Sequence, residues 1–243
     1  DIVTDAFIKL LPKEAEIDKD PQDKHPLLCM TYGTKIPFES ATVIEAVGNA
    51  ANASVSLARL GLKSSLFANI GDDDHGRDML VALKKNAVQT QYMHVNRGKV
   101  SNYHYVLWYE PDRTILIKHE DYDYKWPRIP EEDKPKWIYL SSFAESGARM
   151  HDDITEYLEK NPDVKLAFQP GTFQMRMGFE KLKGLYARTE VYAVNVEEAQ
   201  MMTDKPGERN IRVLAEALHE RGPKIVVITD GPNGSYASDG TQV

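Results

Sequence analysis

The sequence predicts an α/β fold: a three-layer α/β/α sandwich with a mainly parallel central sheet and a small β-sheet lid. Apolar, β-rich runs alternate with amphipathic helical segments along much of the chain, which is typical of a parallel sheet with crossover helices. One β-rich hairpin, with Glu110-Pro111-Asp112-Arg113 as its turn, interrupts the alternation. A chain of 243 residues is long enough to bury one substantial core. We therefore expect one domain over 1–243, with lid segments within roughly 18–45 and 96–120.

The expected elements come from hydrophobic periodicity and from helix-ending signals. Asn49 to Leu60 has the period of a helix, and Gly61 ends it. Prolines and charges between Asp18 and Pro37 indicate irregular chain or short edge strands. The other expected strands span 2–10, 64–70, 103–109, 114–118, 137–140, 165–168, 191–194 and 225–229, and the other expected helices span 77–86, 148–159, 197–202 and 211–221.

Charge and composition limit the functions that are open to the chain. Its 30 basic and 37 acidic residues give a net charge of −7 and form no basic block, so nucleic acid is an unsuitable partner. No run approaches about 18 apolar residues, the length of a membrane span, so we expect no membrane partner. Cys29 is the only cysteine, which excludes an intramolecular disulfide and favours a cytoplasmic location.

Small and amide residues make up the segment Gly48-Asn49-Ala50-Ala51-Asn52. Gly48 permits close backbone approach, and Asn49 is suited to cap the helix that follows. Free backbone N–H groups and the amide side chains are then able to hold hydroxyls or an anion. An ordinary strand-to-helix junction fits the same residues, so the segment alone leaves both interpretations open.

The acidic run Gly71-Asp72-Asp73-Asp74-His75-Gly76 superficially resembles a metal site. Aspartates in a turn before a helix more often supply helix caps than metal ligands. We therefore predict a structural turn at this position.

Two polar segments follow apolar strands, at the strand ends where ligands gather in open α/β sheets. Asn195-Val196-Glu197-Glu198 places an amide and a carboxylate three residues apart, where they suit either hydrated Mg²⁺ near phosphate or a helix cap. Thr229-Asp230-Gly231-Pro232-Asn233-Gly234 is either a phosphate-binding turn or a plain β-turn. The chain has neither a Walker loop nor the Gly-x-Gly-x-x-Gly of NAD-binding folds.

In order and spacing, these segments resemble the signatures of the PfkB carbohydrate kinase family over nearly all of the chain. The run from Gly48 to Gly61, with Gly71-x-Asp73-x-x-Gly76, is similar to the first signature. Asn195-x-x-Glu198 is similar to the Mg²⁺ and phosphate motif, and Thr229-x-Gly231-x-x-Gly234 to the nucleotide-binding turn. The resemblance implies a ribokinase-like fold in which the hairpin belongs to a substrate lid, and it allows a homodimer through that lid.

The same resemblance implies a function: ATP-dependent transfer of a phosphoryl group to a hydroxyl of a sugar or sugar-like molecule. ATP and Mg²⁺ are then the cofactors, and positioning and charge neutralisation supply most of the catalysis. The implied roles are substrate contacts from Asp5, Gly48, Asn49 and Asn52, phosphate and metal contacts from Asn195 and Glu198, with Glu198 as the metal ligand, and nucleotide contacts from Thr229, Gly231 and Gly234.

Two departures from the family pattern affect this expectation. Val47 stands where the family has the first of two glycines, which alters backbone approach to the substrate or the specificity. The family's Gly-Ala-Gly-Asp segment, with the anion hole and the general base, is expected beyond Val243. A general base contributes ~10²- to 10⁴-fold and oxyanion donors ~10²- to 10³-fold. We therefore expect a sugar kinase in the complete form and a nearly inactive chain here, within which no catalytic residue is predicted.

Three alternatives stay open. A non-catalytic sugar- or nucleotide-binding or regulatory protein of the same fold would keep the pocket without the base. A nucleoside kinase is a weaker alternative, and an NAD-dependent oxidoreductase is weaker still. The sequence does not distinguish ribose, fructose, ketodeoxygluconate or nucleosides as the substrate.

Overall fold

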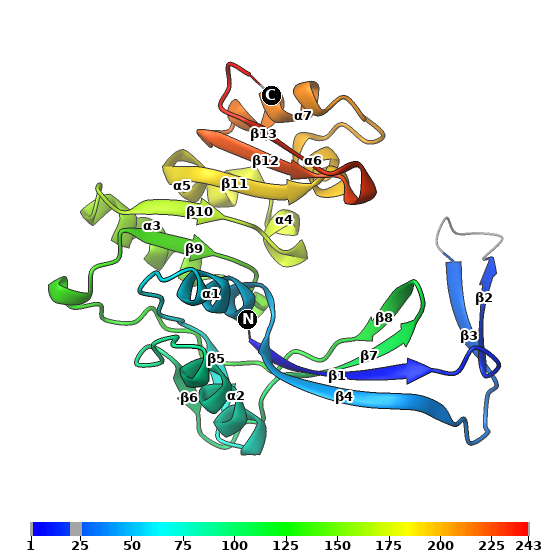
Figure 1. Cartoon of the computed structure of the whole chain (residues 1–243). Coiled ribbons are helices and arrows are strands. Elements are labelled where there is room, and N and C mark those ends of the chain that lie inside the picture. Colours follow the sequence, from blue (N-terminus) through cyan, green and yellow to red (C-terminus); the bar gives the residue numbers. More distant parts are fainter. Residues whose placement is uncertain (1, 20–25, 243) are drawn as a thin grey trace. The chain divides into compact units, whose positions relative to one another are not determined.

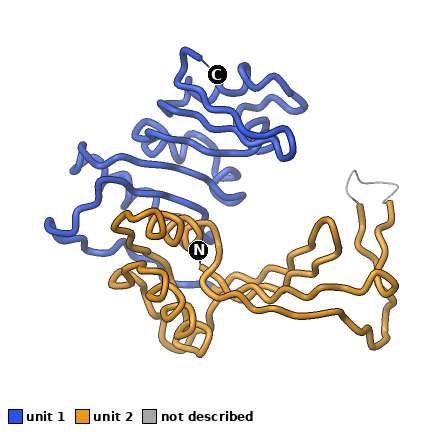
Figure 2. Tube along the Cα trace, in the orientation of Figure 1, with its two compact units in different colours: residues 1, 121–243 blue, residues 2–120 orange. Residues whose placement is uncertain are grey.

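The computed structural model describes residues 2–19 and 26–242. The chain divides into two compact units, one built from residues 2–120 and the other from residues 121–243 (Figure 2). Each unit contains its own sheet and its own helices. The two units are therefore described in turn.

The unit of residues 121–243 is built on a five-stranded sheet (Figure 1). Its strand order is β13-β12-β11-β10-β9, in which β9 to β12 are parallel and β13 is an antiparallel edge strand. Parallel neighbours need a crossover connection, which helices supply here. The strands are β9 (Trp137–Leu140), β10 (Lys165–Phe168), β11 (Thr189–Asn195), β12 (Ile225–Thr229) and β13 (Ser235–Ser238).

The helices of this unit form one continuous layer. Because the parallel strands are added in chain order and crossovers are right-handed, successive connecting helices lie on the same face of the sheet. Consistent with this, α5 packs on α3 and α4, and α6 packs on α4 and α7. No described helix is long and apolar enough to cross a bilayer. The helices are α3 (Met150–Lys160), α4 (Thr172–Met177), α5 (Phe179–Arg188), α6 (Val196–Thr203) and α7 (Ile211–His219), with single 3₁₀ turns at Glu131–Asp133, Glu145–Gly147 and Gly231–Asn233.

Aromatic side chains fill the core of this unit. Phe168, Tyr186 and Tyr192 are fully buried, and their ring centroids lie 5.3, 5.7 and 5.8 Å apart. The hydroxyls of Tyr186 and Tyr192 hydrogen-bond to each other at 3.1 Å, as buried tyrosine hydroxyls require. Burial raises the pKa of both tyrosines, so both remain protonated and the hydrogen bond persists at neutral pH.

The unit of residues 2–120 contains a four-stranded sheet in the order β4-β1-β7-β8. The central strand β1 pairs antiparallel with β4 and parallel with β7, and β7 and β8 form a hairpin. This sheet extends away from the helices of its unit toward a separate two-stranded hairpin, β2-β3 (Figure 1). The strands are β1 (Val3–Leu10), β2 (Ala15–Lys19), β3 (Pro26–Met30), β4 (Phe38–Val47), β7 (Tyr103–Tyr109) and β8 (Asp112–Leu116).

A small α/β layer forms the rest of this unit. It consists of α1 (Asn49–Arg59), α2 (Asp74–Lys85) and the short parallel strands β5 (Asn69–Gly71) and β6 (His94–Asn96). Gly61 has a φ of 86°, and the N–H groups of Gly61 and Leu62 donate back to carbonyls of α1, which confirms the predicted helix end. The core cluster consists of Ile2, Ala46, Ala51, Leu66, Ala68, Ile70, Met79, Leu83 and Val88.

Most expected elements are confirmed to within a few residues, and the exceptions have physical reasons. The strand expected over 64–70 is present only at its end, as β5, while Ser65 makes one isolated bridge to Gln89. β4 was not expected, because most of its side chains are exposed on both faces and leave no apolar alternation. The short helices α4 and α5 were also not expected.

Truncation of a core side chain in α3 tests the packing of its unit. Leu158 is fully buried, and Leu158→Ala should lower the free energy of unfolding by about 2–5 kcal/mol because it leaves a cavity. Glu159 is exposed in the same helix, so Glu159→Ala should change the free energy by less than about 0.5 kcal/mol. Urea unfolding followed by circular dichroism measures both variants. Equal unfolding midpoints for the two would contradict the packing.

Candidate functional site

β4 leads into α1 through a glycine whose backbone other residues rarely adopt. Gly48 has φ 101° and ψ 161° and is the N-cap of α1. The expectation that Asn49 caps this helix is therefore wrong, because Asn49 is already the first helical residue. Gly48 has no side chain to accept from the first-turn N–H groups, which leaves that end of the helix open to an external acceptor.

A β-bulge sets the path of the chain into this turn. Val3 on β1 pairs with Val47, but the next registered pair is Asp5 with Ile44, so β4 carries an extra residue. Ala46, inside the bulge, has a φ of 57°, which is unusual for a residue with a Cβ. Val47 has no such backbone and ends β4 as an ordinary strand residue. A valine at this position is thus compatible with the backbone.

Asn49 and Asn52 present their amides on the first turn of α1. Both residues are exposed, and residues three apart on a helix are neighbours on one face. Neither amide side chain hydrogen-bonds to another described residue. Both are therefore available to a ligand at the glycine-capped helix start.

Asp5 stands on β1 at the same end of the sheet. It lies two residues beyond Val3, about 7 Å along the strand, and Val3 pairs with the residue that precedes Gly48. The side chain of Asp5 is 19% exposed, and Nδ1 of His104 lies 3.4 Å from its Oδ1. Oδ1 makes no hydrogen bond within the described chain. The structure thus brings Asp5 and the turn from Gly48 to Asn52 together within one unit.

The acidic run before α2 is a helix cap, which confirms the predicted structural turn. Oδ1 of Asp73 accepts from the N–H of Gly76 at 2.9 Å and from the hydroxyl of Ser101 at 2.6 Å, and its Oδ2 accepts from the N–H of Ser101 at 2.9 Å. Partial burial pushes the pKa of Asp73 upward, but these hydrogen bonds outweigh it and hold the pKa below its ordinary value. Gly76 leaves no room for a side chain, since an added Cβ would lie 2.4 Å from the carbonyl oxygen of Gly71.

In the other unit, a reciprocal capping box begins α6. The backbone N–H of Asn195 donates to Oε2 of Glu198 at 2.9 Å, and the backbone N–H of Glu198 donates to Oδ1 of Asn195 at 2.7 Å. Both residues are half-buried. No hydrogen bond to another described residue uses Oε1 of Glu198. The cap therefore fixes the carboxylate while leaving one oxygen unused.

Parallel pairing brings the second polar segment beside this capping box. Asn195, the last residue of β11, is the register partner of Thr229, the last residue of β12. In the turn that follows, Gly231 has φ 49° and Gly234 has φ 98°, and the space beside both glycines is open. Backbone groups of the turn are thus within reach of an anion at the carboxyl ends of two neighbouring strands.

The oxygens present fit Mg²⁺ in a hydrated form. Mg²⁺ usually keeps several waters and is held by one or two carboxylates together with substrate phosphates. The described residues contain no group of three or more His, Cys, Asp or Glu side chains that would form a metal cage. Glu198 offers one carboxylate oxygen beside the turn after Thr229. The residues therefore fit an ion that is held mainly through phosphate.

Comparison with protein families identifies the chain: residues 23–243 match the model described as pfkB family carbohydrate kinase. The chain belongs to this family. Similar proteins include the probable fructokinase-5 of Arabidopsis thaliana, 24% identical over 215 residues, which are 81% of this chain and 64% of the relative. A 5-dehydro-2-deoxygluconokinase of Geobacillus kaustophilus is 26% identical over 205 residues, 78% of this chain and 61% of the relative. The chain thus spans less than two thirds of the length of either relative.

Solved structures similar to this pfkB family chain show the same fold. The Arabidopsis thaliana ribokinase complexed with ribose and ATP has a TM-score of 0.72 at 16% identity, covering 100% of this chain and 73% of that chain. The Halothermothrix orenii fructokinase has a TM-score of 0.70 at 19% identity, covering 99% of this chain and 81% of that chain. These likenesses confirm the predicted ribokinase-like α/β fold.

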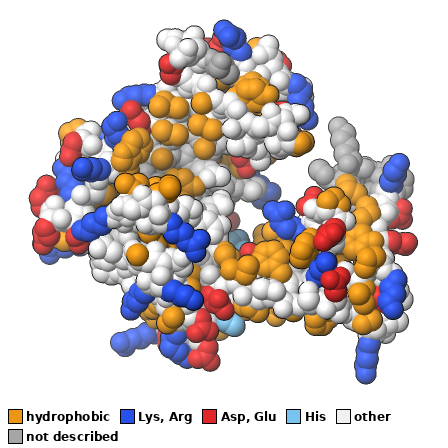
Figure 3. All heavy atoms as spheres, viewed as in Figure 1, with side chains coloured by type: hydrophobic (Ala, Val, Ile, Leu, Met, Phe, Trp, Pro, Cys, Tyr) orange, Lys and Arg blue, Asp and Glu red, His pale blue; other side chains and the backbone are white. Residues whose placement is uncertain are grey.

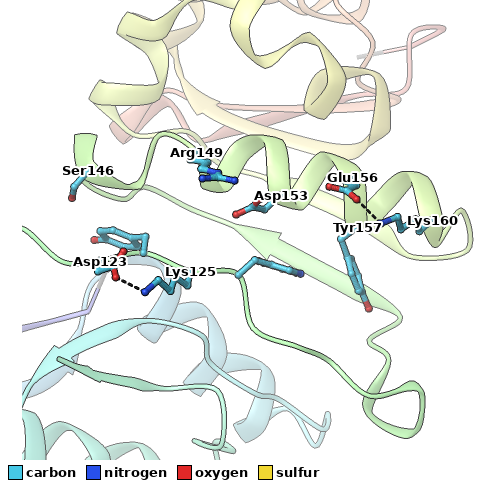
Figure 4. Close-up of a pocket in the computed structure, with 10 residues that line it drawn as sticks. Asp123, Lys125, Ser146, Arg149, Asp153, Glu156, Tyr157 and Lys160 are labelled. Carbon is cyan, nitrogen blue, oxygen red and sulfur yellow. Dashed lines mark hydrogen bonds and ion pairs between the residues drawn. The ribbon is translucent and has the colours of Figure 1, made fainter. Parts of the chain in front are cut away.

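One hollow of the pfkB family chain, about 600 Å³ in volume, contains none of the predicted site residues (Figure 4). Side chains of α3 form one side of it, and residues 123–126 form the other. Lys125 pairs with Asp123 at 2.5 Å and Lys160 pairs with Glu156, so most of its charges are already neutralised. The two remaining charges of its lining, on Arg149 and Asp153, are opposite in sign.

His104 is a site residue that was not predicted from the sequence. The run Tyr103-His104-Tyr105 indicates that the histidine lies on the opposite strand face from the two tyrosines. Its position beside Asp5 depends on the parallel register of β1 and β7, which joins residues about a hundred positions apart. The strand pattern alone contains no signal for that pairing.

Removal of the Asp73 carboxylate tests its role in the pfkB family signature. Asp73→Ala should lower the free energy of unfolding by about 0.5–2 kcal/mol at pH 7. Because the folded-state pKa lies below the unfolded value, this contribution is present above the unfolded pKa and is lost as pH falls through the folded pKa. Asp78, exposed in the same helix, supplies the control Asp78→Ala. Urea unfolding at pH 7 and at about pH 3 measures both, and an Asp73→Ala penalty that is unchanged at low pH would contradict the assignment.

Proposed function

We propose that the protein transfers the γ-phosphoryl group of ATP to a hydroxyl of a sugar or sugar-like molecule. The observation that carries this proposal is the capping box of Asn195 and Glu198 beside the glycine turn after Thr229, at the carboxyl ends of neighbouring parallel strands. Ligands bind at such strand ends in open α/β sheets. Membership of a carbohydrate kinase family supports the reaction class. Relatives named as fructokinase, ribokinase and 5-dehydro-2-deoxygluconokinase support a sugar-like acceptor.

On the nucleotide side, Thr229, Gly231 and Gly234 would line the phosphates of ATP. The positive φ angles of the two glycines are set before a ligand arrives. The N–H groups of Asp230, Asn233 and Gly234 donate to carbonyls within the turn and hold its shape, which leaves the N–H of Gly231 for a phosphate oxygen. This preorganisation is the contribution that we assign to the turn.

Asn195 and Glu198 would organise Mg²⁺ and the phosphates. When bound, Mg²⁺ neutralises charge on the phosphate oxygens and orients the transferred group. Glu198 would keep Oε2 on the N–H of Asn195, as its 2.9 Å hydrogen bond indicates, and direct Oε1 to a water of the ion. The cap then fixes the carboxylate, so that little side-chain entropy is lost when the ion binds.

On the substrate side, Asp5 would accept a hydrogen bond from a hydroxyl of the sugar. Neither oxygen of this carboxylate accepts a hydrogen bond from another described residue, and the side chain is 19% exposed. Asn49 and Asn52 would supply amide groups from the exposed first turn of α1, and Gly48 would allow the ligand to approach the backbone. We further propose that the four-stranded sheet of this unit serves as the substrate lid. We also propose that the protein works in the cytoplasm.

Turnover by the full-length protein tests the function. The probes are D-ribose, D-fructose, 2-keto-3-deoxygluconate, 5-dehydro-2-deoxygluconate and adenosine, each with ATP and Mg²⁺, and ADP release is measured by a coupled assay. We expect turnover with at least one sugar and none with adenosine. Calorimetric binding of a sugar without ADP release would instead favour a non-catalytic binding protein. Neither binding nor turnover with any sugar would refute the proposal.

Glu198→Gln tests the metal role without removing the helix cap, because glutamine also serves in a capping box. Loss of the negative oxygen should raise the Mg²⁺ concentration needed for half-maximal activity by about 10- to 100-fold. Glu197, exposed and paired with Arg209 at 3.4 Å, supplies the matched control Glu197→Gln. Activity of the full-length protein as a function of Mg²⁺ concentration measures the effect. An unchanged Mg²⁺ dependence of Glu198→Gln would exclude Glu198 as a ligand.

We also propose that the protein forms a homodimer through the four-stranded sheet. Val43, Tyr105 and Leu116 form one row across it by register with Ala6 and are 48%, 50% and 52% exposed. Figure 3 shows apolar side chains gathered over this part of the chain.

A charge in this row should separate the two copies. We expect Leu116→Glu to convert the dimer into a monomer in light scattering after size exclusion, because it buries a charge in the interface. Val81→Glu is the control, since Val81 is 64% exposed on α2 of the same unit. A monomeric unmodified protein would contradict the proposed dimer.

A further inference from the structure

We propose that His104 is a positioning residue that holds the Asp5 carboxylate ready to accept a hydroxyl from an uncharged, polyhydroxylated ligand. This role rests on the proposed function of Asp5 in substrate binding. It adds a residue from β7 to the set that β1 and α1 provide. In this arrangement, the carboxylate of Asp5 binds the ligand hydroxyl and the imidazole of His104 holds the carboxylate in place.

The sheet register fixes the two side chains opposite each other. Asp5 on β1 and His104 on β7 are direct partners in the parallel pair, and such partners project from the same face of a sheet. Their side chains are only 19% and 11% exposed. The imidazole is therefore held beside the carboxylate by the backbone and does not meet it by chance at the surface.

Both groups keep unused hydrogen-bonding capacity. Nδ1 of His104 is 3.4 Å from Oδ1 of Asp5, longer than the roughly 2.7–3.2 Å of a formed hydrogen bond. Buried Oδ1 of Asp5 and buried Nε2 of His104 have no hydrogen-bond partner among the described residues. Buried polar atoms without partners are costly, and contacts in ligand-free sites often tighten when the ligand binds. A ligand hydroxyl would donate to Oδ2, the oxygen of this 19% exposed side chain that is not enclosed, while a tightened contact with His104 would satisfy Oδ1.

A second histidine supports the ring of His104. The ring of His119 stands at 88° to that of His104, with centroids 5.4 Å apart. Burial lowers the pKa of His119, and the neighbouring His104 lowers it further. The two rings therefore meet edge to face, and the lowered pKa favours a neutral His119, which adds no positive charge beside the carboxylate.

The carboxylate of Asp5 has no lysine or arginine partner among the described residues, so it is able to accept a hydrogen bond from a ligand. On the same strand face, Nζ of Lys9 forms ion pairs with Oε1 of Glu39 at 2.9 Å and with Oε1 of Glu110 at 3.6 Å. Ile44, the other register partner of Asp5, is 43% exposed, so the face is open on the β4 side. A negative, partly buried carboxylate with no lysine or arginine partner favours neutral hydroxyl donors over anionic groups at this position.

Nuclear magnetic resonance of the ligand-free protein tests the contact itself. In protein labelled with ¹⁵N-histidine, long-range ¹H–¹⁵N spectra report the state of each imidazole nitrogen. Asp5→Asn keeps the shape of the side chain and removes its charge, so it should shift Nδ1 of His104. His94, exposed on β6 of the same unit, should be unaffected. An unchanged His104 signal would overturn the contact, whether or not any ligand is known.

Binding of D-ribose and D-fructose tests the consequence. His104→Phe keeps the ring and loses the donor, and should weaken binding of the preferred sugar by about 10-fold or more. His104→Asn places an amide nitrogen where Nδ1 lies and should keep the affinity within about 3-fold. His94→Phe should have no effect. In the full-length protein, we expect His104→Phe to raise KM and to change kcat little.

The two proposals fail separately in the same calorimetric experiment. Unweakened binding by a folded His104→Phe variant would overturn the role of His104 and leave the sugar-binding function intact. Absence of binding of every sugar in the turnover panel to the unmodified protein would overturn the sugar function and the ligand role of His104 together. Equal losses in His104→Phe and His104→Asn would overturn positioning through Nδ1.

Discussion

The two-sided pairing of β1 is the constraint that brings together the residues proposed to bind the substrate. Antiparallel pairing with β4 places the turn at Gly48 beside the start of β1, and parallel pairing with β7 places His104 opposite Asp5. Neither neighbour alone would bring a glycine-capped helix start and a carboxylate with an imidazole to one place. The bulge at Ala46 shows the cost of this arrangement, because a residue with a Cβ is held at φ 57° to redirect the chain.

The residues proposed to bind the nucleotide are brought together in a different way. Parallel strands added in one direction end at the same edge of the sheet, and each strand is followed by a turn into the next helix. Polar residues at these strand ends are consequently concentrated at one edge, as the register partners Asn195 and Thr229 show. The topology therefore places polar groups at this edge, where we propose the phosphate contacts.

The sequence was sufficient for the features that local chemistry determines. The short apolar strands β9, β10 and β12 were predicted at their observed bounds, and the helix end at Gly61 was confirmed. Local patterns failed where tertiary contacts decide the structure. β4 has no apolar alternation because most of its side chains are exposed on both faces. In contrast, α5 carries a detectable helical spacing in its buried Leu182, Leu185 and Tyr186.

The candidate site divides in the same way. The segments around Gly48, Asn195 and Thr229 are visible as motifs because each is continuous in sequence. Asn49 was predicted as a cap because asparagine favours that position, but the glycine before it has the backbone that begins the helix. His104 is invisible to motif reasoning, since its partner is about a hundred residues away and only the β1-β7 register joins them.

Helix capping and phosphate binding are usually treated as competing explanations for the same residues, but the Asn195–Glu198 pair is compatible with both. A carboxylate has two oxygens and about four acceptor sites, and the cap occupies Oε2 through one backbone N–H. The remaining oxygen is held in place by the bond that the first one makes. A capped carboxylate is therefore a better-positioned ligand for a hydrated ion than a free one, because its rotamer is already fixed before the ion arrives. Asp5 differs from Glu198, because its 3.4 Å contact with His104 is longer than a formed hydrogen bond and leaves its buried oxygen without a donor.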